Sequence, residues 1–207
     1  MSPLSRKTLR QNNRQARRAL DAPIRTAYEA AILRTISRHP RLRKVRRLAL
    51  YWPADGEVDL RPLTGMWLPP REQLYLPILA RGSRLRFAPW DARTRLRPNR
   101  FGIPEPHVNT RALRRPIQLD AVLLPLVGFD DHGNRLGMGG GFYDRSFAFR
   151  HARRRWRKPL LIGVAFELQR CPPLPVEVWD IPLDGIVTEH GYACFNDFKD
   201  ALLWPTG

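Results

Sequence analysis

Short apolar runs, separated by Pro, Gly and Asp, recur along most of the chain and predict a buried sheet. The runs cover residues 48–52, 74–79, 85–90, 121–127, 160–166 and 186–188. Each has the length of a β-strand. The runs at 121–127 and 160–166 are apolar at consecutive positions, which is typical of strands covered on both faces. We therefore expect a central sheet that is mostly parallel.

Helical patterns precede the first run and separate later ones. Helices are predicted at residues 1–20, 22–39, 60–68 and 143–157. The first is mostly polar, and its loose apolar face includes Leu9 and Ala16. The second follows Asp21, a predicted N-cap. Strands that alternate with helices favour an α/β sandwich.

Length and composition narrow the class of protein. The chain has 207 residues, of which 43% are hydrophobic, so we expect one folded domain and exclude a disordered chain. No run of 18 apolar residues and no secretory signal is present, and we expect a cytoplasmic protein. Cys171 and Cys194 lack metal-site spacing, and the five histidines lack the spacing of metal ligands.

The net charge of +17 raises the question of a polyanionic partner. Most of the 36 basic residues are arginines, and they are spread over the whole chain. This spread favours a solvated surface, although a nucleotide or a polyglutamylated cofactor would also be attracted. A basic nucleic-acid-binding protein remains the alternative, because clusters such as residues 150–158 match its charge requirement.

A glycine-rich loop follows the predicted strand at 121–127. It contains Gly137 and the run of glycines at 139–141. Glycine lets backbone N–H groups approach an anion closely, and the predicted helix after the loop would add the positive end of its dipole. Arg135 and Arg145 flank the loop, and Asp144 suits Mg²⁺. The loop lacks the Lys-Ser/Thr ending of a P-loop.

Three other segments carry candidate polar residues. Trp52 and Glu57 follow the first predicted strand, where they form either a plain turn or a flat face with a carboxylate for a heteroaromatic ring. Asp180 and Asp184 precede the last strand, either as turn acids or as a partner of Asp144 in a metal site. Residues 98–106 are predicted as a rigid loop.

Several of these segments occur together, in the same order, in one known family. They are residues 6–10, 51–59, 99–106, 133–144 and 169–184. The most specific is Arg135-Leu136-Gly137-Met138-Gly139-Gly140-Gly141-Phe142-Tyr143-Asp144. On these residues the chain resembles the 5-formyltetrahydrofolate cyclo-ligase family. The resemblance implies a Rossmann-like three-layer α/β/α sandwich with N-terminal helices, in a single domain over residues 1–207.

The resemblance also implies an activity: ATP- and Mg²⁺-dependent conversion of 5-formyltetrahydrofolate to 5,10-methenyltetrahydrofolate, ADP and phosphate. The implied ATP contacts are Arg6, Lys7, Thr8, Leu9, Arg10, Arg135, Leu136, Gly137, Met138, Gly139, Gly140, Gly141, Phe142 and Tyr143. The implied folate contacts are Trp52, Glu57, Met138, Gly139, Gly140, Gly141 and Phe142.

Within this set, the resemblance gives Arg135 and Arg10 the catalytic role and makes Asp144 and Asp180 the Mg²⁺ ligands, with Asp184 as the alternative to Asp180. Arg6 stands where the family more often has Lys, which keeps the charge but changes the geometry. We expect no covalent nucleophile, no membrane partner and a monomer.

Overall fold

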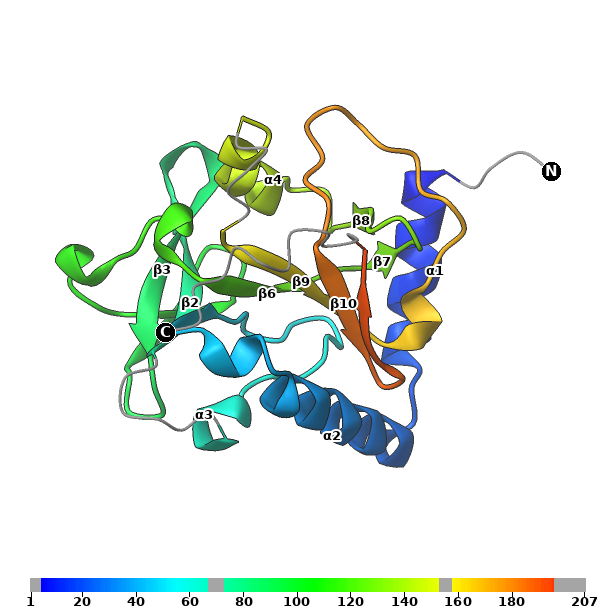
Figure 1. The fold of residues 1–207 in the computed structure, drawn as a ribbon, viewed down its shortest axis with the longest axis horizontal. Coiled ribbons are helices and arrows are strands. Elements are labelled where there is room, and N and C mark those ends of the chain that lie inside the picture. Colours follow the sequence, from blue (N-terminus) through cyan, green and yellow to red (C-terminus); the bar gives the residue numbers. More distant parts are fainter. Residues whose placement is uncertain (1–4, 67–72, 153–157, 196–207) are drawn as a thin grey trace.

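A seven-stranded sheet forms the centre of the computed structural model, which describes residues 5–66, 73–152 and 158–195 (Figure 1). The strand order is β11-β10-β9-β6-β1-β2-β3. The strands are β1 Arg47–Ala49, β2 Gln73–Ala80, β3 Arg84–Trp90, β6 Ala121–Pro125, β9 Leu160–Val164, β10 Gly185–Thr188 and β11 Gly191–Cys194. The five strands from β10 to β2 are mutually parallel, whereas the edge strands β3 and β11 are antiparallel to their neighbours.

The predicted mostly parallel α/β architecture is confirmed. All six predicted strands are present, although β1 is shorter than the run at 48–52. The sequence analysis missed β11, a short strand of mixed polarity that pairs only with β10 at the sheet edge. The carboxyl ends of the parallel strands lie at one end of the sheet, which is where α/β folds bind their ligands.

Helices cover both faces of the sheet. On one face, α2 (Ala22–Arg38) buries Ile32, Leu33 and Ile36 against the strands. On the other, α4 (Phe142–Phe147) inserts Phe147 into a second apolar cluster. The four-residue α3 (Leu63–Met66) lies on the α2 side. The single-turn 3-10 helices are η1 Leu42–Lys44, η2 Arg81–Ser83, η3 Thr110–Ala112, η4 Pro116–Gln118, η5 Ala148–Arg150 and η6 Glu167–Gln169.

The N-terminal helix α1 (Arg6–Arg18) is anchored mainly by polar groups. Its predicted apolar face is partly wrong, because Ala16 is exposed. The inward positions are Leu9, Asn13 and Arg17, each four residues from the next, so they share one side of the helix. A search for apolar residues at helical spacing misses this face of α1, because two of its three inward residues are an asparagine and an arginine.

Other predicted elements are shorter than expected. Asp21 occupies the N-cap of α2, but its side chain makes no capping hydrogen bond. Within the predicted helix at 60–68, only α3 forms, and residues 67–68 lie outside the described residues. The predicted helix at 143–157 is α4 followed by η5, and residues 153–157 also lie outside the description.

Two small hairpins replace predicted loops. The segment at 98–106 is not a loop but the turn and second strand of a hairpin, β4 (Leu96–Pro98) with β5 (Pro104–Pro106). The side chain of Asn99 closes its turn by accepting hydrogen bonds from the N–H groups of Phe101 and Ile103. The second hairpin, β7 (Gly128–Phe129) with β8 (Arg135–Leu136), leads directly into the glycine-rich loop.

Candidate active site

The glycine-rich loop is held in shape by two guanidinium groups. Arg10 of α1 donates from Nε to the carbonyl oxygen of Gly137 at 2.8 Å. Arg145 of α4 donates to the carbonyl oxygen of Gly140. Gly141 has φ of +62°, in the left-handed region that favours glycine, and an added Cβ would lie 2.8 Å from Nη1 of Arg145. Position 141 therefore favours glycine for its backbone conformation, and an added Cβ would also displace Arg145.

The two guanidinium groups bond to carbonyl oxygens of the loop, and the backbone N–H groups of the loop stay available for a ligand. The backbone N–H groups of residues 137–144 donate to no acceptor within the described ranges. Met138, Gly139 and Gly140 are exposed. A row of free amides beside two guanidinium groups offers hydrogen-bond donors to an anion. The predicted helix does begin at Phe142, but α4 has only six residues, so its dipole adds little to this surface.

Arg135 lies beneath the loop and connects it to the segment before β10. Its guanidinium pairs with Asp144 and donates to the carbonyl oxygen of Ile181. The side chain of Arg135 is 7% exposed. Burial lowers the pKa of Arg135, and the carboxylates of Asp144 and Asp180 oppose that shift. The buried cation thus brings two of the predicted metal ligands to one place.

Asp144 and Asp180 each keep one carboxylate oxygen without a hydrogen-bond donor among the described residues. Oδ1 of Asp144 accepts from Arg135 and from the N–H of Ile181, and Oδ2 of Asp180 accepts from Arg6 and from the N–H of Glu177. Two half-used carboxylates beside an anion surface fit Mg²⁺, which takes few protein ligands and completes its shell with phosphate and water.

Asp184 does not share this arrangement. Its carboxylate is 2% exposed, pairs with Arg150 and accepts the N–H of Leu161. It therefore fastens β9 to the start of β10, and of the two alternatives left open by the sequence the structure favours Asp180. Among the described residues, no group of three or more His, Cys, Asp or Glu side chains is placed to hold a metal.

Trp52 and Glu57 lie on the segment after β1, on the α2 side of the sheet. The Trp52 ring meets the ring of Trp90 edge-on at 6.1 Å between centroids, and Arg61 lies over it at 5.2 Å. Glu57 accepts the N–H of Ala54 at 3.1 Å. Burial raises the pKa of Glu57 to about 7, despite the opposing charge of Arg17.

Glu57 and the start of α4 lie close enough to interact electrostatically. Burial raises the pKa of Tyr143, and the next largest cause is the carboxylate of Glu57. Tyr143 belongs to the first turn of α4, so the Glu57 carboxylate lies within electrostatic reach of the loop. The free amides of the loop and the Glu57 carboxylate therefore belong to the same region of the fold.

Arg17 and Asp55 are site-building residues that the sequence analysis missed. Arg17 is 1% exposed and donates to the carboxylate of Asp55, to the carbonyl oxygen of Asp55 and to that of Leu126. Arg14 and Arg18 also pair with Asp55. This clamp joins α1 to the ends of β1 and β6. The Asp-Gly pair at 55–56 signals only a turn, and nothing in the sequence connects it with α1.

The remaining predicted contacts divide into accessible and buried side chains. Lys7 and Met138 are exposed, and Thr8 is tied to the N-cap by a 2.8 Å contact with Ser5. Leu9 and Leu136 pack into one buried cluster. We expect these two leucines to hold α1 against the loop rather than to touch a ligand.

The fold and the site define an α/β protein with a glycine-rich loop whose backbone N–H groups make no hydrogen bond among the described residues. A sequence model of the 5-formyltetrahydrofolate cyclo-ligase family matches residues 3–189. The cyclo-ligase of Escherichia coli K12 is 35% identical over 179 residues, which is 84% of this chain and 95% of that protein. The Haemophilus influenzae cyclo-ligase is 37% identical over 70% of this chain and 76% of its own length.

Solved structures agree with the sequence relatives. The NMR structure of Aquifex aeolicus 5,10-methenyltetrahydrofolate synthetase is 32% identical, has a TM-score of 0.79 and covers 94% of both chains. The chain therefore belongs to the 5-formyltetrahydrofolate cyclo-ligase family, and it is an enzyme of the ligase class. The described part of the chain has no helix that is long and apolar enough to cross a membrane.

Proposed function

We propose that this protein converts 5-formyltetrahydrofolate to 5,10-methenyltetrahydrofolate, using ATP and Mg²⁺ and releasing ADP and phosphate. The observation that carries the proposal is the row of free amides at residues 137–144, backed by Arg10 and Arg145 and set close to the Glu57 carboxylate. An anion site near a carboxylate fits a triphosphate and a pterin that react with each other.

At the nucleotide end of the site, ATP would be bound by positively polarised groups whose positions are fixed by the fold. The free amides of the loop bind the phosphate oxygens, and α1 adds positive charge through Arg10, which is bonded to Gly137, and Arg6, which is paired with Asp180. Because the loop carbonyls are already bonded to guanidinium groups, the amide orientation exists before the ligand arrives. Pre-oriented donors lose little energy on reorganisation, which is how positioning accelerates phosphoryl transfer.

Asp144 and Asp180 would hold Mg²⁺, each through its unused carboxylate oxygen. The ion would supply charge neutralisation on the transferred phosphoryl group. Arg135 places the Asp144 carboxylate, Arg6 pairs with Asp180, and the charge of Arg135 also interacts with Asp180. Its role is that of a positioning residue at the metal end of the site.

At the folate end, Trp52 offers a flat surface and Glu57 an acceptor. A pterin ring presents N–H donors side by side, which an ionised carboxylate binds well. The Trp52 ring is fixed between Trp90 and Arg61, so its orientation is set before binding. Glu57 is pre-oriented by the N–H of Ala54.

The chemistry then needs no covalent nucleophile from the protein. The γ-phosphoryl group passes from ATP to the formyl oxygen, and ADP is the leaving group. The neighbouring nitrogen of the substrate attacks the activated formyl carbon and loses its proton. Phosphate leaves with the former formyl oxygen. The chain's own contribution is to hold the formyl oxygen in line with the γ-phosphate and to exclude water from it.

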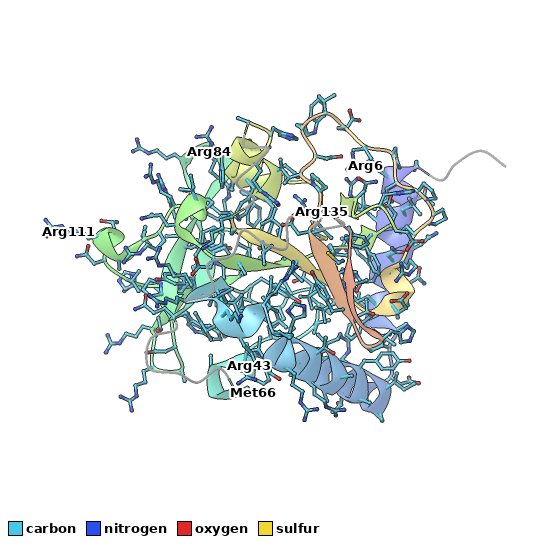
Figure 2. All side chains as sticks on the ribbon, in the orientation of Figure 1. Arg6, Arg43, Met66, Arg84, Arg111 and Arg135 are labelled. Carbon is cyan, nitrogen blue, oxygen red and sulfur yellow. The ribbon has the colours of Figure 1, made fainter. Side chains whose placement is uncertain are left out.

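The nucleic-acid alternative receives less support from the structure. Many arginines are committed to acids or carbonyl groups within the fold, as in the Asp55 clamp and the Arg150–Asp184 pair. Most of the cluster at 150–158 lies outside the described residues. The remaining exposed cations are distributed around the molecule, as the side chains in Figure 2 show.

The test is a continuous assay of the methenyl chromophore with purified protein, 5-formyltetrahydrofolate and Mg-ATP. We expect turnover in the wild type and a loss of tenfold or more in kcat/KM for ATP in Arg10→Ala, because one charge-assisted contact to phosphate is removed. Arg34→Ala, on the exposed side of α2, is the matched control and should behave as wild type. Absence of turnover in the wild type would refute the proposed function.

A further inference from the structure

One short segment, residues 38–47, concentrates positive charge before β1. Exposed cations occur on several sides of the molecule (Figure 2), but in this basic segment six of ten consecutive residues are Arg or Lys. They are Arg38, Arg41, Arg43, Lys44, Arg46 and Arg47. No acidic residue occurs in the chain between Glu29 and Asp55. The proposed ligase activity gives this segment no role.

Two buried side chains fix the basic segment so that the cations around them project into solvent. Leu42 and Val45 are fully buried and pack into the same apolar cluster as α2. The backbone is fixed as well, because the N–H of Arg43 donates to the carbonyl oxygen of His39 at 3.0 Å. The exposed cations around these anchors include Arg38, Arg43, Lys44 and Arg46.

The one acid that is bonded to the basic segment leaves these four cations uncompensated. Oδ2 of Asp120 accepts the backbone N–H groups of Arg46 and Arg47, and its Oδ1 pairs with Lys158 at 3.4 Å. Within the described ranges, the side chains of residues 38, 43, 44 and 46 form no ion pair. A cluster of cations without internal counter-ions attracts a polyanion.

The basic segment is separate from the candidate active site. It precedes β1, whereas Trp52 and Glu57 follow β1, so the two features lie at opposite ends of that strand. In Figure 2 the labelled Arg43 lies on the α2 side of the molecule, away from the labelled Arg6 and Arg135. A partner held by the basic segment is therefore not a ligand of the catalytic site.

We propose that the basic segment binds the phosphate backbone of an RNA duplex. Its only ring is that of His39, which already meets the ring of Tyr192 at 4.3 Å between centroids. Proteins that bind single strands stack the bases on free aromatic rings, and this segment offers none. Contacts from Arg and Lys to phosphate carry no base information, so the binding is independent of sequence.

The crowding of the cations favours RNA over DNA. An RNA duplex has a deep and narrow major groove, so the phosphates of its two strands lie close together across that groove. The major groove of B-DNA is about 12 Å wide, and its phosphates are correspondingly farther apart. Six cations within ten residues match the denser array of negative charge.

The experiment measures the affinity of the full chain for a labelled RNA duplex of about 20 base pairs by fluorescence anisotropy over a range of salt concentrations. The segment variant is Arg38→Gln/Arg43→Gln/Lys44→Gln/Arg46→Gln. The matched control, Arg81→Gln/Arg84→Gln/Arg93→Gln/Arg97→Gln, removes the same charge from exposed residues elsewhere.

We expect the segment variant to bind the duplex at least about tenfold more weakly than the wild type, because up to four phosphate contacts are lost. The slope of log K against log salt should fall in magnitude by about 3 to 4, since each such contact contributes about 0.9. The control should stay within about twofold of the wild type, because charges farther away than a Debye length are screened. The ligase rate and Tm of the segment variant should match those of the wild type.

Three results would overturn the inference. Equal losses of affinity in the segment variant and the control would show that binding comes from net charge alone. A DNA duplex or a single-stranded RNA that binds as tightly as the RNA duplex would contradict the chosen partner. A wild-type protein that does not bind the duplex even at low salt would remove the site altogether. None of these results bears on the proposed ligase activity, which is measured separately.

Discussion

Replacing Glu57 by glutamine tests whether the folate end of the site contains a buried carboxyl group whose ionised form is destabilised. Glu57 has its pKa raised from 4.5 to about 7, chiefly by burial. A raised carboxyl pKa contributes stability while the group is protonated, so this contribution is present below pH 4.5 and is lost as the pH rises through 7. Proton linkage with these two values gives a loss of about 2.5 kcal/mol between pH 5 and pH 8. Glutamine keeps the acceptor for Ala54 but does not titrate.

The assay is urea or thermal unfolding of both proteins at pH 5 and pH 8. Relative to wild type, Glu57→Gln should gain about 2.5 kcal/mol on going from pH 5 to pH 8, or about 5–10 °C in Tm for a chain of this size. Taking the difference between the two proteins cancels every other titrating group. If the stability difference does not change with pH, Glu57 is not a buried carboxylate of raised pKa, and the reasoning fails.

A second pH effect belongs to substrate binding. If the ionised carboxylate binds the N–H donors of the pterin, KM for the folate should rise about tenfold per pH unit below 7, because the binding form of the enzyme is depleted. In Glu57→Gln that slope should be absent and KM high at every pH. Initial rates from pH 5.5 to 8 at saturating ATP measure both, and parallel profiles for the two proteins would contradict the assignment.

Three further substitutions test the rest of the site. Arg17→Met should cost about 1–3 kcal/mol in urea unfolding, because the carbonyl oxygen of Asp55 loses its donor and that of Leu126 keeps only Gln169; a loss below ~0.5 kcal/mol would show that the clamp is dispensable. Gly141→Ala should raise KM for ATP at least tenfold, whereas Gly65→Ala, where a Cβ meets open space, should not. Asp144→Asn should raise the Mg²⁺ concentration needed for half-maximal rate, and an unchanged Mg²⁺ titration would remove Asp144 from the metal site.

The sheet could be predicted because the apolar pattern of each strand lies within a few consecutive residues. Strands such as β6 and β9 are covered on both faces, so nearly every position is apolar, and the pattern reads directly as a buried strand. The glycine-rich loop was equally visible, since backbone donors and left-handed turns require glycine at specific positions. The predictions of a phosphate site at the loop and of a metal ligand at Asp144 also came from residue types alone.

The features that the sequence did not predict depend on contacts between segments that are distant in the chain. Asp180 and Asp184 look alike in the chain, and only packing separates them: Arg150 and the N–H of Leu161 fully engage Asp184, whereas Asp180 faces Arg6. The Arg17–Asp55 clamp is another such case. A buried ion pair leaves no periodic trace, because its partners come from different elements and satisfy each other only after folding.

The sequence by itself determined the sheet, the loop and the family of this protein, since each depends on residue types at fixed local spacing. The tertiary structure shows that Asp180 pairs with Arg6 while Asp184 pairs with Arg150, how the polar helix α1 is held in place, and that Glu57 lies within electrostatic reach of Tyr143. It also shows that the cations of the basic segment project into solvent around the buried Leu42 and Val45. Burial and charge pairing are properties of the packed chain, and no local pattern specifies them.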